Sequence, residues 1–255
     1  VISLIGPNGA GKSTVMGMIS RLIAHDSGLV DFEGKDIGKW KSKELSKRLA
    51  ILTQSNNIQM KLTVRELVAF GRFPYSGNRV TLEDQKIIDR AISYMELEGF
   101  QDRFIDELSG GQRTKVLLGK LLLEKPDILL LDEPTAGMDA LSRRQMWNLL
   151  RQLNGKNLTI LLTTHYMEEA QSLCNRVALM DHGKLEEINT PSGLIDGLGK
   201  YTVDQETPEG AKSHYFHSRE EAISFLSSLD GQCTLRETTL EDVFVERAGR
   251  HLMQR

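Results

Sequence analysis

Cysteine is scarce in this sequence, and so are long apolar runs and an excess of charge of either sign. Two cysteines, Cys174 and Cys233, are too few for a disulfide framework and favour a reducing compartment. No apolar run approaches the roughly 20 residues of a membrane-spanning helix, and no signal peptide is visible. A net charge of −3 provides no broad positive field, so we expect no nucleic-acid partner. The 255 residues can form one large globular domain, or one domain and a small appendage.

A glycine-rich turn joins a short apolar run at 1–5 to a helix predicted over 15–24. Strand, turn and helix in this order are the setting of a phosphate-binding loop, and every fixed position of G-x-x-x-x-G-K-[ST] is present. The glycines let N–H groups point at an anion, and the helix start adds roughly half a positive charge. Lys12 can reach the β- and γ-phosphates, and Ser13 can ligate Mg²⁺. The predicted nucleotide-binding residues are Gly6, Pro7, Asn8, Gly9, Ala10, Gly11, Lys12, Ser13 and Thr14.

The hydrophobic periodicity divides the chain into three regions. Buried strands predicted at 49–53, 128–132 and 158–163 place 1–54 and 126–190 in an α/β core, which also holds a strand at 29–33 and a solvated helix at 40–48. Residues 55–125 are mainly helical, with an aromatic-bearing loop at 71–77, and are predicted to form an inserted subdomain. Residues 191–255 alternate short strands and helices. The predicted fold class is α/β: a P-loop NTPase with a RecA-like core, an inserted helical subdomain and a small C-terminal α+β appendage.

Two acidic residues follow the apolar run at 128–131. In a P-loop enzyme, Asp132 can hold Mg²⁺ through water, and Glu133 can activate the attacking water molecule. General-base help of this kind contributes about 10²–10⁴ in rate. By itself, an acidic pair after a hydrophobic strand can also be a strand end that faces solvent. The phosphate loop makes a catalytic role the better interpretation.

The run Leu108-Ser109-Gly110-Gly111-Gln112 forms a second candidate anion site at a helix start. A serine hydroxyl, exposed N–H groups and the helix dipole all favour an anion there, although a glycine-rich N-cap explains the same residues. One nucleoside triphosphate needs only one such anion-binding helix start. We therefore predict that this second helix start contacts a nucleotide held by another copy of the chain, in a head-to-tail pair.

These motifs, in this order, resemble the ATP-binding-cassette (ABC) ATPase domain, and the resemblance covers about residues 1–190. It implies that Gln54 senses Mg²⁺ and water and moves with the helical subdomain. It also implies that Ser109, Gly110 and Gly111, with Gln112 beside them, contact the γ-phosphate of the opposite subunit's ATP. Asp139 would lie in the loop that connects the two sites, and His165 would act as the switch histidine on the γ-phosphate. The implied catalytic residues are Glu133, His165 and Gln54, and the implied metal ligands are Ser13, Gln54 and Asp132.

Two features depart from the family pattern. The family places a β-hairpin with an adenine-stacking aromatic before the phosphate loop, whereas this sequence starts at Val1, so we expect a truncated N-terminus. Residues 1–112 resemble iron–siderophore importer ATPases. Residues 114–134 resemble the ribosome-associated type of cassette, and residues 136–199 and 239–244 resemble drug and polysaccharide exporter ATPases. These mixed likenesses lead to the hypothesis of a recombined or engineered mosaic, with an unusual natural paralogue as the alternative.

The resemblance implies an ATP-hydrolysing subunit of an ABC membrane transporter, with ATP and Mg²⁺ as its ligands. A second ATPase subunit, in a homodimer, and integral membrane transporter subunits are the implied partners. The implied location is cytoplasmic, peripheral on the inner face of the cell membrane. Two alternatives stay open: an engineered or truncated cassette that binds nucleotide but is catalytically weak, and a soluble ABC protein without a transport role.

Overall fold

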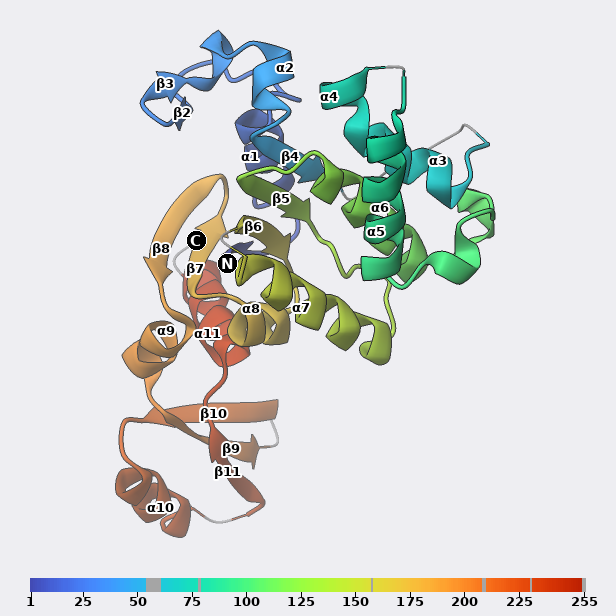
Figure 1. The fold of residues 1–255 in the computed structure, drawn as a ribbon. Helices are drawn as coiled ribbons and strands as arrows, with labels where there is room; N and C mark the ends of the chain where they lie inside the picture. The colour runs from blue at the N-terminus through green and yellow to red at the C-terminus, as the bar shows by residue number, and fades with distance from the viewer. Residues whose placement is uncertain (54–60, 78, 157, 208–209, 230, 254–255) are drawn as a thin grey trace.

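A computed structural model describes residues 1–53, 61–77, 79–156, 158–207, 210–229 and 231–253. A six-stranded sheet lies at its centre (Figure 1). The first five strands in the sheet order are parallel, and the last is antiparallel to its neighbour. The order across the sheet is β4 (Leu49–Leu52), β5 (Ile128–Asp132), β6 (Thr159–Thr164), β1 (Ile2–Ile5), β7 (Arg176–Asp181) and β8 (Lys184–Asn189). The carboxyl ends of β1, β5 and β6 therefore meet at one edge, where ligands bind in open α/β sheets.

Both faces of this sheet are covered, as the near-continuous apolar runs of its strands predict. In β5, Leu129 and Leu131 belong to the larger apolar cluster, and Leu130 between them belongs to a smaller one on the other face. The larger cluster includes buried residues of α6 (Gly110–Leu123), α7 (Ala140–Asn154) and α8 (Met167–Leu173). The smaller cluster contains Met16 from α1 (Lys12–Ile19). Helices thus sandwich the sheet and fix the direction of its strand ends.

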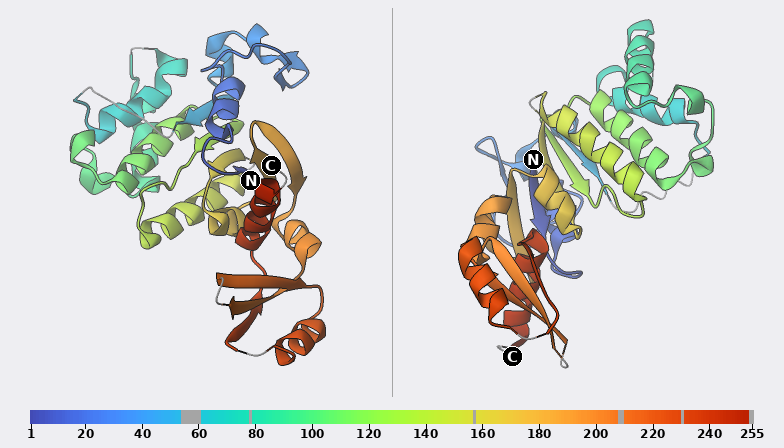
Figure 2. Two further views of the ribbon diagram at one scale, coloured as in Figure 1. Left: turned by 180° about the vertical axis from the view of Figure 1, so that it is seen from behind. Right: turned by 90° about the horizontal axis from the view of Figure 1, so that it is seen from below.

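The described part of the segment between β4 and β5 is mainly helical and projects to one side of the sheet (Figures 1 and 2). Capping boxes start α3, α5 and α6, because Thr63, Thr81 and Ser109 each accept a hydrogen bond from the backbone three residues on. A buried ion pair between Arg72 and Asp84, 2.7 Å long, fastens α5 to the turn after α3. The elements are α3 (Val64–Ala69), η2 (Phe70–Arg72), α4 (Phe73–Ser76), α5 (Leu82–Tyr94), η3 (Glu98–Phe100), η4 (Ile105–Glu107) and α6.

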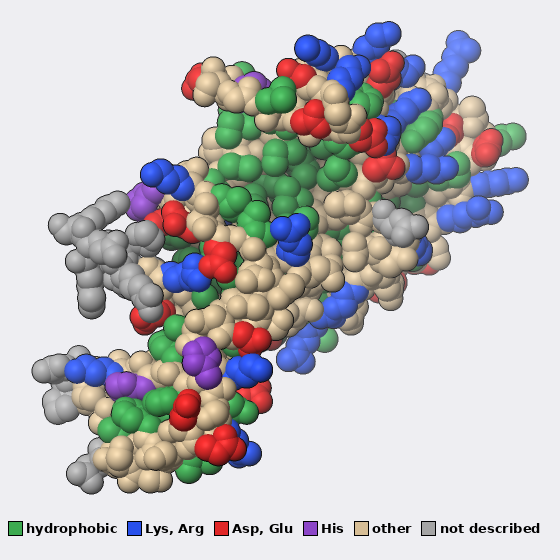
Figure 3. All heavy atoms as spheres, turned by 90° about the vertical axis from the view of Figure 1, so that its left-hand side faces the viewer, with side chains coloured by type: hydrophobic (Ala, Val, Ile, Leu, Met, Phe, Trp, Pro, Cys, Tyr) green, Lys and Arg blue, Asp and Glu red, His purple; other side chains and the backbone are tan. Residues whose placement is uncertain are grey.

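Most of the region after β8 forms a lobe at the lower end of the molecule in Figures 1 and 3. A three-stranded antiparallel sheet in the order β10-β9-β11 carries α10 against it. The last helix, α11, returns to the core and contacts α8 and α9. The elements are α9 (Pro191–Leu198), β9 (Tyr201–Thr207), β10 (Gly210–Phe216), α10 (Arg219–Ser227), β11 (Cys233–Glu237) and α11 (Leu240–Met253).

The structure corrects four predicted elements near the N-terminus and in the insert. The helix predicted at 15–24 ends at Ile19, because Arg21 takes a positive φ of 63° and the N–H groups of Arg21 and Leu22 close back on the Met18 and Gly17 carbonyls. The strand predicted at 29–33 is reduced to β2 (Asp31–Phe32), paired with β3 (Lys35–Asp36). The helix predicted at 40–48 is only α2 (Ser42–Leu45), preceded by η1 (Ile37–Lys39). The loop predicted at 71–77 contains η2 and α4.

The predicted α/β fold, with its helical segment and C-terminal α+β lobe, is confirmed. The exact domain boundaries stay predictions. Within the described ranges, no helix combines the length and apolar character that a membrane span requires.

Candidate nucleotide-binding and catalytic site

The loop between β1 and α1 has the backbone that only glycine provides easily. Gly9 and Gly11 have φ values of 83° and 95°, in the left-handed region that L side chains rarely adopt. Gly6 lies so close to β7 that a Cβ on it would be 2.1 Å from the carbonyl oxygen of Met180. The N–H of Gly183, after β7, donates to the Ala10 carbonyl at 2.9 Å. Strand β7 and the turn after it therefore pack against the loop and fix its curved backbone.

Lys12 opens α1 and turns its side chain back over the loop. Its Nζ donates to the carbonyl oxygens of Gly6 and Pro7, at 2.9 and 3.0 Å. Burial lowers the pKa of Lys12, while the nearby carboxylates of Glu133 and Asp132 act in the opposite direction. The ammonium group is thus held over the loop, where an anion in the curl of the backbone would meet a compact positive charge.

Two hydroxyl groups converge on the carboxylate of Asp132, at the end of β5. Ser13 Oγ donates to Asp132 Oδ1 at 3.1 Å, and Thr163 Oγ1 on β6 donates to the same oxygen at 2.5 Å. Asp132 and Thr163 are buried. This arrangement joins the start of α1 to two strand ends and presents oxygen atoms of the kind that Mg²⁺ prefers.

Glu133 follows at the point where β5 turns away from the sheet. Its φ of 49° is left-handed, and its N–H lies 3.1 Å from Thr163 Oγ1 and 3.2 Å from the Thr163 carbonyl oxygen. Its Oε1 lies 3.1 Å from His165 Nδ1. The Glu133 side chain is 12% exposed and that of His165 is 42% exposed. A constrained backbone therefore aims this carboxylate at a histidine from the next strand end.

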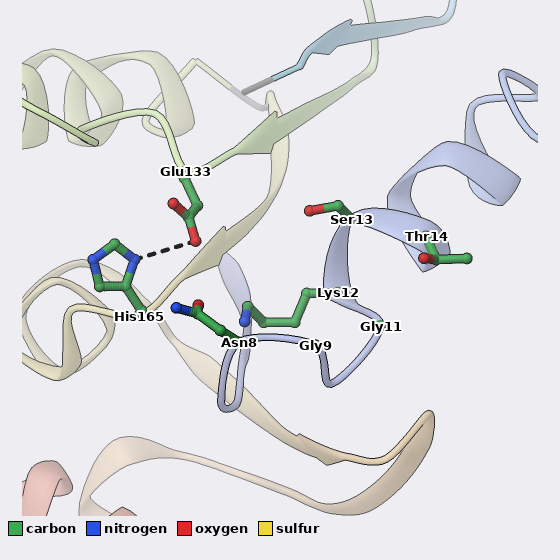
Figure 4. Close-up of a pocket in the computed structure, with 8 residues that line it drawn as sticks. All are labelled: Asn8, Gly9, Gly11, Lys12, Ser13, Thr14, Glu133 and His165. Carbon is green, nitrogen blue, oxygen red and sulfur yellow. Dashed lines mark hydrogen bonds and ion pairs between the residues drawn. The ribbon is translucent and has the colours of Figure 1, made fainter. Parts of the chain in front are cut away.

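The phosphate loop, the start of α1, Glu133 and His165 line a cavity of about 520 Å³, which lies in the size range of small-molecule sites. Figure 4 shows Lys12, Ser13, Glu133 and His165 gathered around the hollow, with the Thr14 side chain pointing away. The lining residues are Asn8, Gly9, Gly11, Lys12, Ser13, Thr14, Glu133 and His165. A cation, backbone donors, a carboxylate and an imidazole around one cavity can bind a phosphate chain and move a proton beside it.

Of the predicted site residues that the structure describes, the others do not line this cavity. Ser109 caps α6, its hydroxyl accepting from the Gln112 N–H at 3.3 Å, and Gly110 beside it is exposed. Gly111 approaches Met138 and Ser142 at the start of α7. Asp139 caps α7 and accepts hydrogen bonds from the backbone N–H groups of residues 141 and 142 and from the Ser142 hydroxyl. The hydroxyl bond is the largest of the effects that lower the pKa of Asp139. Gln54 lies outside the described residues.

Sequence reasoning missed the part that Thr163 plays. Its hydroxyl touches Asp132 and the backbone of Glu133, so it links the two acidic residues to β6. A threonine at the end of an otherwise apolar run was the available signal, because a buried hydroxyl needs a hydrogen-bond partner. The sequence could not reveal which partner that was, since strand order sets it.

Comparison with known proteins adds to this geometry. A family model described as "ABC transporter" matches residues 1–136. The petrobactin import ATP-binding protein YclP of Bacillus subtilis is 39% identical over 77% of this chain and 78% of its own length. The Nod factor export ATP-binding protein I of Burkholderia lata is 32% identical over 98% of this chain and 88% of its own. The mosaic hypothesis stays a prediction.

A solved structure of the dimeric ATP-binding cassette MJ0796, in a post-hydrolysis state bound to ADP and phosphate, is also similar. It has a TM-score of 0.66 and 28% identity, covering 74% of this chain and 84% of that one. The phosphate loop, the strand-end carboxylates and these matches agree. The chain belongs to the ABC transporter family, as an ATP-binding subunit homologous to the ATP-binding proteins of importers and exporters.

Proposed function

We propose that this chain binds ATP in the cavity at the start of α1 and hydrolyses it to drive a membrane transporter. The observation that carries the proposal is the contact of Glu133 Oε1 with His165 Nδ1, 3.1 Å, in a cavity that Lys12 and Ser13 also line. The curled loop and Lys12 bind the β- and γ-phosphates. The family supports both ATP binding and ATPase chemistry.

Mg²⁺ fits the oxygen donors beside the loop. Ser13 Oγ and Asp132 Oδ1 are 3.1 Å apart, and Mg²⁺ in nucleotide sites keeps several waters and takes one or two protein ligands together with phosphate oxygens. Among the described residues, no cluster of three or more His, Cys, Asp or Glu side chains is placed to hold a metal. The proposed protein ligands of Mg²⁺ are Ser13, Asp132 and Gln54, and phosphate oxygens of the nucleotide complete the site. When bound, the ion neutralises charge on the phosphates.

Glu133 is the proposed general base. Its carboxylate accepts a proton from the water that attacks the γ-phosphate, and the phosphate loop holds the leaving ADP. His165 orients this carboxylate and contacts the γ-phosphate. Gln54 is the third catalytic residue that the family resemblance implies, and it would link the site to the helical segment.

The proposed active form is a head-to-tail homodimer. Ser109, Gly110 and Gly111 start a helix, are at least partly exposed, and lie outside the cavity of their own chain. Together with Gln112, they are proposed to complete the ATP site of a second copy. Asp139 lies nearby, at the start of α7. The dimeric structure of the similar cassette MJ0796 supports the proposal of a dimer.

The helical segment is the proposed contact with integral membrane subunits. Phe70, Phe73 and Tyr75 are 45%, 57% and 38% exposed on consecutive short helices. Exposed aromatic side chains are enriched at protein interfaces. The chain would then lie on the cytoplasmic, inner face of the cell membrane. ATP-driven closure of the dimer would pass through these helices to the membrane subunits.

The variant Glu133→Gln separates binding from chemistry. Because an amide cannot accept the proton, we expect ATP turnover to fall by about 10²–10⁴. ATP affinity should stay close to that of wild type, and the variant should accumulate as an ATP-bound dimer. Phosphate release, equilibrium ATP binding and light scattering would be measured on the same preparation. Retained turnover would remove Glu133 from the role of base.

A further inference from the structure

A carboxylate with no assigned function lies at the centre of the core, between the segments that follow three site residues. Glu169, on α8, has no exposed surface. Its Oε1 accepts a hydrogen bond from Thr135 Oγ1 at 2.9 Å and another from Trp147 Nε1 at 2.8 Å. Both donor residues are themselves buried, with 1% and 5% of their surface exposed. One oxygen atom therefore connects three separate stretches of the chain.

Each of these stretches carries a residue of the proposed site. Thr135 lies two residues after Glu133, in the turn that leaves β5. Trp147 is on α7, which Asp139 caps. Glu169 is on the helix that begins just after His165. The hydrogen bonds to Glu169 Oε1 thus fix the spacing of three segments of the chain. Each segment leads to a residue that is proposed to act on the nucleotide of this chain or of a second copy of the protein.

Stability alone is a poor reason to keep a carboxylate here. Taking a charged group out of water is costly, and well-packed apolar side chains often replace buried ionic groups without loss of stability. Glu169 Oε2, moreover, has no hydrogen-bond partner among the described residues. Only Oε1 is used, so the arrangement resembles a fixed acceptor for two donors rather than a fully satisfied ion site.

We propose that Glu169 is a positioning residue for ATP hydrolysis, which holds the Glu133 turn, α7 and the His165 helix in register. This inference rests on the proposed roles of Glu133 and His165. Glu169 touches no substrate. It acts through Thr135 on the direction of the Glu133 carboxylate, and through its own helix on the imidazole that contacts this carboxylate.

Because only Oε1 of Glu169 accepts these hydrogen bonds, two variants of Glu169 can test its role as an acceptor. In Glu169→Gln, the amide oxygen can accept both hydrogen bonds, while the amide nitrogen takes the place of Oε2. In Glu169→Leu, the side chain keeps a similar volume but offers no acceptor. We expect Glu169→Leu to lower kcat at least ~10-fold with KM for ATP within about twofold of wild type, because Lys12 and the loop are untouched. We expect Glu169→Gln to restore kcat to within about threefold of wild type.

A matched control removes an equally buried hydrogen bond far from the site. The hydroxyl groups of Thr202 and Thr238, in the C-terminal lobe, lie 2.8 Å apart and are 0% and 4% exposed. Thr202→Val should lower the melting temperature, because it leaves the Thr238 hydroxyl without this partner, and should leave kcat unchanged. If Thr202→Val lowers kcat as much as Glu169→Leu, loss of stability explains the effect and the proposal is overturned.

Two further variants test the same contacts if Glu169→Leu does not fold. Thr135→Val and Trp147→Phe each remove one donor and leave the other in place. Each should lower kcat less than Glu169→Leu, again with little change in KM. Wild-type kcat in both would overturn the proposal.

Glu133→Gln, measured in parallel, separates the positioning role of Glu169 from the proposed role of Glu133 as the base. If Glu133→Gln hydrolyses ATP normally, the proposed base is wrong. A slow Glu133→Gln with an unaffected Glu169→Leu contradicts only the positioning role.

Discussion

The central sheet and the C-terminal sheet use polar residues in opposite ways. In the central sheet, β5 is apolar from residue 128 to residue 131 and packs on both of its faces. Asp132 ends the strand, and Glu133, which follows it, lines the cavity. In the C-terminal sheet, β10 is largely exposed, and polar side chains lie along the strands themselves. There Arg236 pairs with Asp204 at 2.6 Å and with Asp242 at 2.7 Å.

The difference shows how the fold divides its tasks. The apolar side chains of amphipathic helices cover both faces of the central sheet, so hydrophobic burial holds it, and its strand ends are available to bind ligands. In the C-terminal sheet, the charged groups are directed at each other and stabilise the lobe. We therefore expect changes at the strand ends of the core to alter ATP chemistry and changes in the lobe to alter stability alone.

One helix joins the two regions. Leu240 and Val243 of α11 are buried in the core cluster, whereas Asp242 between them pairs with Arg236 of the lobe. The backbone N–H of Leu240 also donates to Gln171 Oε1 on α8 at 3.0 Å. The lobe is thus anchored beside the helix that follows His165.

The largest effect within this comparison is expected from Gly6→Ala, in the core. Its Cβ would lie 2.1 Å from the Met180 carbonyl oxygen, so the phosphate loop or β7 must shift. Overpacking of this kind costs about 3 kcal/mol, and the distorted loop should also weaken ATP binding. Chemical unfolding and ATP titration would measure both losses. Gly99→Ala is the control, because nothing lies within 4 Å of its new Cβ. Wild-type stability and ATP binding in Gly6→Ala would show that the loop does not need the close approach of Gly6 to Met180.

A smaller effect is expected from Arg236→Met, in the lobe. Burial alone would raise the pKa of Asp242 and of Asp204. Hydrogen bonds from Arg236, with others from Thr239 and Ser213, outweigh that effect and lower both pKa values. Removing Arg236 should cost about 1 kcal/mol at pH 7, a small figure because the pair is partly exposed and screened by solvent. ATP turnover should not change.

The pH dependence of this loss has a definite sign. A carboxylate whose pKa is lowered in the folded state adds stability above its unfolded pKa of about 3.9 and loses it as the pH falls through the folded value. The difference between wild type and Arg236→Met should therefore shrink below about pH 4. Unfolding curves at several pH values would show it. A difference that is constant with pH, or a loss of ATP turnover at pH 7, would contradict the division between lobe and core.

Local motifs made much of the site predictable. Gly9, Gly11 and Lys12 are close in sequence, and their backbone conformation follows from residue type and the strand–turn–helix setting. Glu133 and His165 each follow a buried strand, and parallel strands bring their carboxyl ends together. The overall α/β fold followed from the same apolar runs.

Contacts between distant segments were not predictable. The meeting of Thr135, Trp147 and Glu169 depends on how α7 and α8 pack on the sheet, which no local pattern encodes. The early end of α1 was also missed, because it depends on the positive φ of Arg21, a residue type that rarely adopts that conformation. The roles of Ser109–Gln112 and Asp139 stay predictions, since they require a second copy of the chain.

Equilibrium binding of ATP to Lys12→Ala, measured beside wild type and Glu133→Gln, tests the central claim most directly. Lys12 is proposed to bind the phosphates, and hydrogen bonds to charged groups contribute about 1.5–3 kcal/mol each. The account therefore predicts that Kd for ATP rises at least ~10-fold in Lys12→Ala and stays near the wild-type value in Glu133→Gln. Equal ATP affinity in all three proteins would contradict the assignment of this cavity as the ATP site.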